Sequence, residues 1–211
     1  MPVNQPKRSL QISIATIAWL AVILQLYLQI VNRTTAVSEA LIRFFSYFTI
    51  LTNIIVAVCF TALALQKGKA FNIFNNPGRL TAVTVYILIV GLVYNLVLRS
   101  LWQPQGLQLI VDNLLHSVTP LLTLIFWFVY TSTQNINWKE PLAWMAYPLF
   151  YLIYVMIRGS FSDFYPYFFI DVSKLGYSKA FTNAMYITFG FLIVSYLLIV
   201  LGKLRKVSTV A

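Results

Sequence analysis

Long runs free of charged residues alternate with short charged clusters along this chain. Six runs contain no Lys, Arg, Asp or Glu: 9–32, 44–66, 80–98, 113–138, 141–157 and 180–202. A helix needs about 20 mainly apolar residues to cross roughly 30 Å of bilayer hydrocarbon. The pattern therefore predicts an all-α polytopic membrane protein. We expect a single domain over residues 1–211, with six transmembrane helices at about 9–32, 40–66, 80–101, 109–131, 141–158 and 178–202.

The composition agrees with this class and excludes several others. Of the 211 residues, 60% are hydrophobic and 9% are charged, whereas soluble domains carry about 25% charged residues. The 16% of aromatic residues argues against intrinsic disorder, because such a chain can bury much apolar surface. A single cysteine, Cys59, and a single histidine, His116, exclude an intrachain disulfide framework and the usual protein-held zinc or iron–sulfur sites. No cofactor or metal is expected.

The distribution of basic residues predicts the orientation. Six spans place both termini on one side, and the first run is too long for the core of a cleaved signal peptide. Nine Lys and Arg lie on the side of the termini: Lys7, Arg8, Lys67, Lys69, Arg79, Lys139, Lys203, Arg205 and Lys206. Six lie on the other: Arg33, Arg43, Arg99, Arg158, Lys174 and Lys179. The excess predicts cytoplasmic termini in a cell membrane. These residues form no continuous patch, so the expected partners are membrane lipids and not nucleic acid.

Polar residues within the predicted spans share helix faces. On the second span, Arg43, Ser46, Thr49 and Asn53 follow one stripe, and on the fourth, Asp112, His116, Thr119 and Thr123 follow another. The remaining spans contribute Asn95, Arg99, Tyr147, Tyr151, Tyr154, Arg158 and Asn183. The alternating directions of the spans put these groups in the outer half of the membrane. Six charged residues are expected on or just above one outer pocket: Arg43, Arg99, Asp112, Arg158, Asp163 and Asp171.

Two prolines and one aromatic connection add local detail. Pro120 should kink the fourth span and free the carbonyl of His116, leaving Asn113 on the concave side, while Pro148 should free the carbonyl of Trp144. The connection 159–177 is rich in Phe and Tyr. It is interpreted either as an aromatic belt with a short interfacial helix or as a lid over an outer cavity.

Three segments carry a family resemblance. They are Phe45-Ser46-Tyr47-Phe48-Thr49-Ile50-Leu51-Thr52-Asn53, Asp112-Asn113-Leu114-Leu115-His116-Ser117-Val118-Thr119-Pro120, and Tyr147-Pro148 through Arg158-Gly159 to Tyr165-Pro166-Tyr167-Phe168. They resemble the bacterial six-transmembrane Pr-six-Pr family. That family in turn is similar to the eukaryotic androgen-induced membrane hydrolases of the androgen-dependent TFPI-regulating type, which cleave fatty acid esters of hydroxy fatty acids. The resemblance implies Thr49 as nucleophile and His116 as its histidine partner. Asp112 stands where the eukaryotic motif carries Asn.

The residues allow the same chemistry to be argued directly. A threonine hydroxyl needs a base within about 2.6–3.2 Å, and His116 is the histidine available. Asp112 either fixes the tautomer of His116 or pairs with Arg99 or Arg158. A developing oxyanion would find donors in Asn53, Asn95 or Arg158. The free carboxylate of a lipid-like substrate would be held by Arg99 or Arg158, with Tyr151 and Tyr154 in support.

The function hypothesis that follows is an intramembrane hydrolase of lipid esters, with its site among the second to fifth spans. Two alternatives stay open. The same polar cavity would serve a noncatalytic protein that binds or moves a lipid or small anion. In an assembly subunit, the polar stripes would contact another chain instead.

Overall fold

The computed structural model describes residues 5–205, and these form helices without any strand. In chain order the elements are α1 (Gln5–Val31), α2 (Val37–Ser46), α3 (Phe48–Leu65), α4 (Gly68–Phe74), α5 (Pro77–Val93), η1 (Tyr94–Leu98), α6 (Gly106–Asn113), η2 (Leu114–Val118), α7 (Thr119–Tyr130), α8 (Glu140–Trp144), α9 (Ala146–Ser162), η3 (Phe168–Ile170) and α10 (Val172–Leu204). The segments η1 and η2 are π-helical, and η3 is a 3₁₀ turn.

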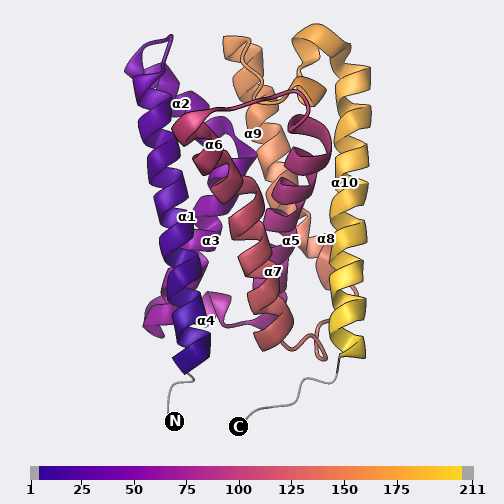
Figure 1. Ribbon diagram of the computed structural model, residues 1–211. Coiled ribbons are helices and arrows are strands. Elements are labelled where there is room, and N and C mark those ends of the chain that lie inside the picture. Colours follow the sequence, from indigo (N-terminus) through magenta and orange to yellow (C-terminus); the bar gives the residue numbers. More distant parts are fainter. Residues whose placement is uncertain (1–4, 206–211) are drawn as a thin grey trace.

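Six of these helical stretches are long and apolar enough to cross a membrane, as predicted. They are Gln5–Val31, Phe48–Leu65, Pro77–Leu98, Gly106–Tyr130, Glu140–Ser162 and Val172–Leu204. They lie side by side in one bundle (Figure 1), in which α1 begins and α10 ends at the same end. The opposite end, called the distal end below, carries the α1–α2, η1–α6 and α9–α10 connections.

The second predicted range, 40–66, does not form one helix. It is interrupted at Tyr47, whose backbone is extended (φ −84°, ψ 125°), so that α2 and α3 are separate helices. The hydroxyl of Tyr151 donates to the Ser46 carbonyl at 2.8 Å, and this stabilises the break because a buried carbonyl must find a donor. The predicted continuous stripe through Arg43 and Thr49 is therefore split between two helices.

The fifth and sixth ranges also contain changes of direction. A turn at Met145 separates α8 from α9, three residues before Pro148. The Trp144 carbonyl accepts a hydrogen bond from the hydroxyl of Tyr86 at 2.6 Å. The predicted freeing of this carbonyl is thus confirmed, and a neighbouring helix satisfies it. In α10, Gly176 has φ 73° and ψ 160°, a conformation that kinks the helix near its start and that glycine adopts without steric cost.

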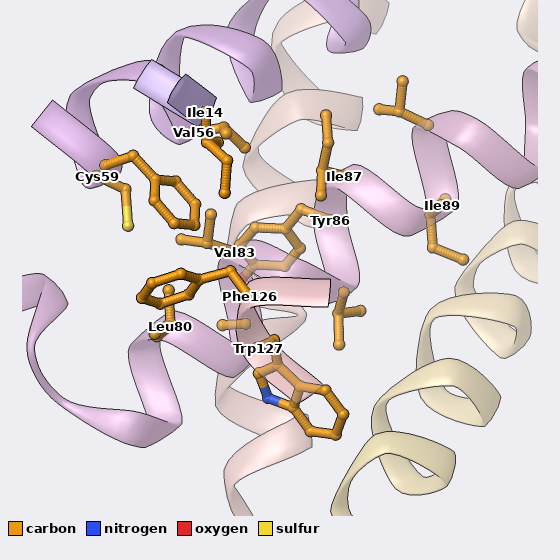
Figure 2. Close-up of a cluster of buried hydrophobic side chains, with 14 of the residues drawn as sticks. Ile14, Val56, Cys59, Leu80, Val83, Tyr86, Ile87, Ile89, Phe126 and Trp127 are labelled. Atoms are coloured by element: carbon orange, nitrogen blue, oxygen red, sulfur yellow. The ribbon is translucent and has the colours of Figure 1, made fainter. Parts of the chain in front are cut away.

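The hydrophobic core joins α1, α3, α5 and α7. Figure 2 shows Ile14, Val56, Cys59, Leu80, Val83, Tyr86, Ile87, Ile89, Phe126 and Trp127 packed together. Ile14 lies in the first half of α1, and Phe126 lies near the end of α7, so this core sits toward the end of the bundle where α1 begins. A second buried cluster includes Phe44, Ile50 and Leu115, and these three residues line the larger of the two cavities described next.

Candidate active site

A cavity of about 500 Å³ opens among the helices at the distal end. Its lining includes both Thr49 and His116, and we call it the polar cavity. The other polar or charged residues around it are Gln25, Gln29, Asn32, Arg33, Thr34, Thr35, Arg43, Tyr47, Tyr94, Trp102, Gln108, Asp112 and Tyr167. The size is in the range of ligand sites in proteins, which run from about 300 to 1,000 Å³.

Thr49 lies in the first turn of α3 because of the break at Tyr47. The first backbone N–H groups of a helix have no partner within it, and here no side chain of the N-cap residue supplies one. The backbone N–H of Thr49 instead donates to the hydroxyl of Tyr167 at 3.3 Å. The same hydroxyl lies 3.4 Å from Thr49 Oγ1. The side chain of Thr49 is buried and reaches the polar cavity.

His116 lies in η2, the π-helical segment that precedes Pro120. Its Nδ1 is 2.9 Å from the backbone carbonyl of Asp112. Because a carbonyl only accepts hydrogen bonds, this contact puts the proton of the neutral imidazole on Nδ1 and leaves Nε2 as an acceptor. An imidazole in this tautomer is suited to act as a base through Nε2.

Pro120 has no backbone N–H, so the carbonyl of His116 receives no hydrogen bond from the residue four positions on, as predicted. It accepts a hydrogen bond from Asn95 Nδ2 at 3.1 Å. Gly91 allows this approach, since a Cβ at that position would lie 3.0 Å from the same carbonyl oxygen. The prolyl break in one helix is therefore compensated by an amide from the helix beside it.

Asp112 holds His116 through its backbone, and its carboxylate has other partners. The buried carboxylate accepts hydrogen bonds from the Trp102 indole at 2.8 Å, the Gln108 amide at 3.0 Å and the Tyr94 hydroxyl at 3.3 Å. It forms no salt bridge with Arg99 or Arg158. Of the two expected roles, tautomer control therefore applies through the Asp112 carbonyl, and pairing with arginine does not.

The two arginines expected to hold a substrate carboxylate line neither the polar cavity nor a second, smaller cavity described below. Arg158 pairs with Glu39 at 2.7 Å and stacks over Phe164, and Arg99 donates to Asn95 Oδ1 at 2.9 Å on the exposed surface. The arginines that do line the polar cavity are Arg33 and Arg43.

The remaining predicted site residues separate into three groups. Asn53 lies under Thr49 and donates to the carbonyls of Thr49 at 2.9 Å and Leu115 at 3.3 Å. Tyr151 and Tyr154 both contact Ser46. The Tyr151 hydroxyl donates to the Ser46 carbonyl at 2.8 Å, and the Tyr154 hydroxyl lies 3.3 Å from Ser46 Oγ. Asn113 is half-buried and lines neither cavity.

The two acidic residues of the aromatic connection also lie outside both linings. Asp163 follows α9 with a left-handed backbone, and Asp171 caps α10 by accepting from the backbone N–H of Ser173 at 3.1 Å. Of the six charged residues expected around the pocket, only Arg43 and Asp112 line it. The other acids serve helix ends, where the chain needs polar partners.

A second, smaller cavity of about 90 Å³ adjoins the first. Its lining is almost entirely apolar and includes Phe48, Ile89, Val93, Leu152, Ile187 and Phe191. Thr49, Tyr94, Leu98 and Tyr167 line both cavities. Thr49 therefore lies on the wall between a polar and an apolar cavity.

Sequence reasoning missed Tyr94 and Tyr167 as members of the site. The ring of Tyr94 stacks on His116, and the hydroxyl of Tyr167 contacts Thr49. Tyr94 lies next to the expected site residue Asn95, and Tyr167 lies in the aromatic connection. These positions were the signal that could have indicated both tyrosines as site residues. No local pattern distinguished either from the other 11 tyrosines.

Thr49 and His116 share the polar cavity, but no hydrogen bond joins their side chains in the part of the chain that the structure describes. Direct contact between Thr49 and His116, the expected nucleophile and base, stays a prediction. Within residues 5–205, no group of three or more His, Cys, Asp or Glu side chains is arranged to hold a metal ion. No protein-family model, curated protein or solved structure matches the chain.

Proposed function

We propose that the protein is a multi-pass membrane hydrolase of lipid esters, such as fatty acid esters of hydroxy fatty acids, with Thr49 as nucleophile and His116 as base. One observation carries the proposal: Thr49, on the wall between a polar and an apolar cavity, shares the polar cavity with a histidine whose Nε2 is an acceptor. We also propose that the chain is related to the Pr-six-Pr family and to the androgen-induced hydrolases.

The proposed reaction uses a covalent intermediate. The Thr49 hydroxyl passes its proton to His116 Nε2 as Oγ1 forms a bond to the ester carbonyl carbon, and the carbonyl π electrons move to oxygen. Collapse of the tetrahedral species breaks the bond to the alcohol oxygen, which takes the proton from His116. Water, deprotonated by His116, then attacks the acyl carbon; the bond to Thr49 Oγ1 breaks, Oγ1 takes that proton from His116, and the acid is released. The apolar cavity suits an acyl chain, and the polar cavity suits the remainder of the ester.

The orientation is proposed from charge. More Lys and Arg flank the end of the bundle that carries the termini than the distal end, which favours cytoplasmic termini in a cell membrane of a bacterium. The cavities then open in the outer half of the membrane. In a Cys59→Ala background, a membrane-impermeant maleimide should label Asn32→Cys and spare Asn75→Cys in intact cells. The opposite labelling pattern would reverse the orientation.

An alkyl fluorophosphonate tests the chemistry. Purified protein in detergent should gain one covalent adduct on Thr49, found by intact mass and peptide sequencing, and should hydrolyse esters from a lipid panel. Thr49→Ala and His116→Ala should abolish both, and Thr49→Ser should retain them. Thr52→Ala is the matched control, since Thr52 is also buried but bonds to Tyr147, and it should be labelled like the wild type.

A noncatalytic lipid or anion binder is the second candidate. It is favoured by one contact, because Thr49 Oγ1 pairs with Tyr167 and not with His116, and by Arg33 and Arg43 on the cavity lining. Folded protein that binds a fatty acid in the cavity, yet forms no fluorophosphonate adduct and turns over no ester, would replace the hydrolase by this binder.

A further inference from the structure

The oxyanion of the proposed ester cleavage needs donors, and the amides nearest to Thr49 are already in use. Both hydrogens of the Asn53 amide point to carbonyls, those of Thr49 and Leu115. The Asn95 amide donates to the carbonyls of Gly91 at 2.9 Å and His116 at 3.1 Å. Redirecting either amide would orphan a buried carbonyl, at a cost of roughly 1–3 kcal/mol.

Arg158, the third donor expected from the sequence, is also committed. Its Nη2 pairs with Glu39, and its Nη1 donates to the Ser162 hydroxyl and to the Phe164 carbonyl at 3.4 Å. It does not line the polar cavity. The groups that remain beside Thr49 Oγ1 are the backbone N–H of Thr49 and the hydroxyl of Tyr167.

Tyr167 is held firmly in this position. Its ring stacks on Phe169 with centroids 5.2 Å apart and meets Tyr47 edge-on at 5.9 Å. The Asn183 amide of α10 donates to the Phe169 carbonyl at 2.9 Å, which ties the segment to the bundle. Tyr167 lines both cavities, and its hydroxyl contacts Thr49. A group so fixed is preorganised, which is the property that makes an electrostatic donor effective.

Resting on the proposed hydrolase function, we propose that Tyr167 is a catalytic residue whose hydroxyl, together with the backbone N–H of Thr49, forms the oxyanion site. In the resting state, the Tyr167 hydroxyl accepts from the Thr49 N–H and donates to Thr49 Oγ1, so the proton of Thr49 is free to face the cavity. As Oγ1 bonds to the ester carbon, its lone pair is used and the carbonyl oxygen gains negative charge. The Tyr167 O–H and Thr49 N–H then donate to that oxygen, and no proton leaves Tyr167.

The position of Thr49 at the start of α3 strengthens this arrangement. The positive end of the helix dipole lies at the first turn and favours nearby negative charge. Burial raises the pKa of Tyr167 to about 12, so its hydroxyl stays protonated at neutral pH and can donate. Tyr167 therefore serves as a donor while His116 serves as the base.

The test compares Tyr167→Phe with Tyr147→Phe in the full chain. Both substitutions keep the ring and remove one hydroxyl, but the Tyr147 hydroxyl bonds to Thr52 and not to Thr49. Loss of one oxyanion donor typically lowers kcat by about 10²–10³. We expect that loss in Tyr167→Phe with KM within about threefold of wild type, and affinity for an alkyl trifluoromethyl ketone falling in parallel. Fatty acid affinity should stay unchanged, and Tyr147→Phe should keep kcat within threefold.

A second variant tests the donor without removing it. Site-specific replacement of Tyr167 by 3,5-difluorotyrosine keeps ring and hydroxyl and lowers the phenol pKa. The rate should then fall at alkaline pH as the phenol ionises, which a purely structural role would not produce. Wild-type kcat in Tyr167→Phe, or an unchanged pH profile with difluorotyrosine, would overturn the assignment. Wild-type protein that forms no fluorophosphonate adduct and turns over no ester would instead contradict the proposed hydrolase function itself.

Discussion

The imidazole of His116 lies flat against the phenol ring of Tyr94, with the ring centroids 3.8 Å apart and the planes inclined by 11°. The two rings come from facing π-helical segments, η2 and η1. The Tyr94 hydroxyl also donates to the Asp112 carboxylate. The stacked ring of Tyr94 thus fixes the plane of the imidazole, and the Asp112 carbonyl fixes its tautomer. π-helical turns inside α-helices frequently occur at functional sites.

Removing this stack should slow the proposed reaction at Thr49. Tyr94→Leu deletes the ring that fixes the imidazole plane, and a small misplacement of a catalytic group costs rate heavily. We expect the fluorophosphonate labelling rate of Thr49 to fall on the order of tenfold or more. Tyr94→Phe keeps the stack and should stay within about threefold of wild type. Equal labelling rates for the two variants would show that stacking does not position His116.

Enlarging Gly159 should displace the aromatic connection. A Cβ at Gly159 would overlap the ring of Tyr165, which packs directly on α9. Overpacking of this kind costs about 1–3 kcal/mol, and the displaced segment carries Tyr167. Gly159→Ala should therefore lower the thermal midpoint in detergent and reduce Thr49 labelling. Gly190→Ala is the control, since its nearest neighbour would be Ile89 Cδ1 at 3.9 Å, and no loss in either assay is expected.

The ion pairs of Glu39 should make stability depend on pH in the acid range. Hydrogen bonds from Arg43 and then Arg158 hold the pKa of Glu39 below its ordinary 4.5. A carboxyl with a lowered pKa in the folded state contributes stability above its ordinary pKa, and the contribution disappears as pH falls through the lower, folded-state value. The thermal midpoint of Glu39→Gln should be below that of wild type at pH 7, and the two should converge below pH 4.5.

The control for Glu39 is Asp163→Asn. Asp163 is exposed and has no salt bridge within residues 5–205, and asparagine tolerates its left-handed backbone. At pH 7, the thermal midpoint of Asp163→Asn should stay close to that of wild type, because the substitution removes no ion pair of the described residues. A Glu39→Gln curve that stays parallel to wild type from pH 7 to well below pH 4.5 would contradict the ion-pair account.

Arg33 should contribute to binding where Arg99 does not. Arg33 lines the polar cavity, and Arg99 lies outside both linings. Arg33→Gln is expected to raise KM for an ester with a free carboxylate about fivefold, equivalent to ~1 kcal/mol for an exposed pair, and to leave a neutral ester unaffected. The effect should shrink with added salt. Arg99→Gln is the matched variant. A larger rise in KM in Arg99→Gln than in Arg33→Gln would show that Arg99 binds the substrate carboxylate.

The features that the sequence determined by itself are local ones. Six apolar runs predicted six long apolar helices, because covering the backbone with apolar side chains over about 20 residues depends only on neighbours in the chain. Pro120 and Pro148 predicted the freed carbonyls of His116 and Trp144, because a proline removes the hydrogen bond to the residue four before it. The sequence therefore predicted these two carbonyls as acceptors, but it did not predict the side chains that donate to them.

Only the tertiary structure decided the partners. The break at Tyr47 has no proline or glycine beside it and depends on Tyr151, 105 residues from Ser46. Asn95, Tyr86 and Tyr167 reach their targets from other helices or from the aromatic connection. Arg33 and Arg43, and not Arg99 or Arg158, line the cavity. Contacts of this kind depend on how separate helices pack, and a pattern along one helix carries no record of which neighbour its polar groups will meet.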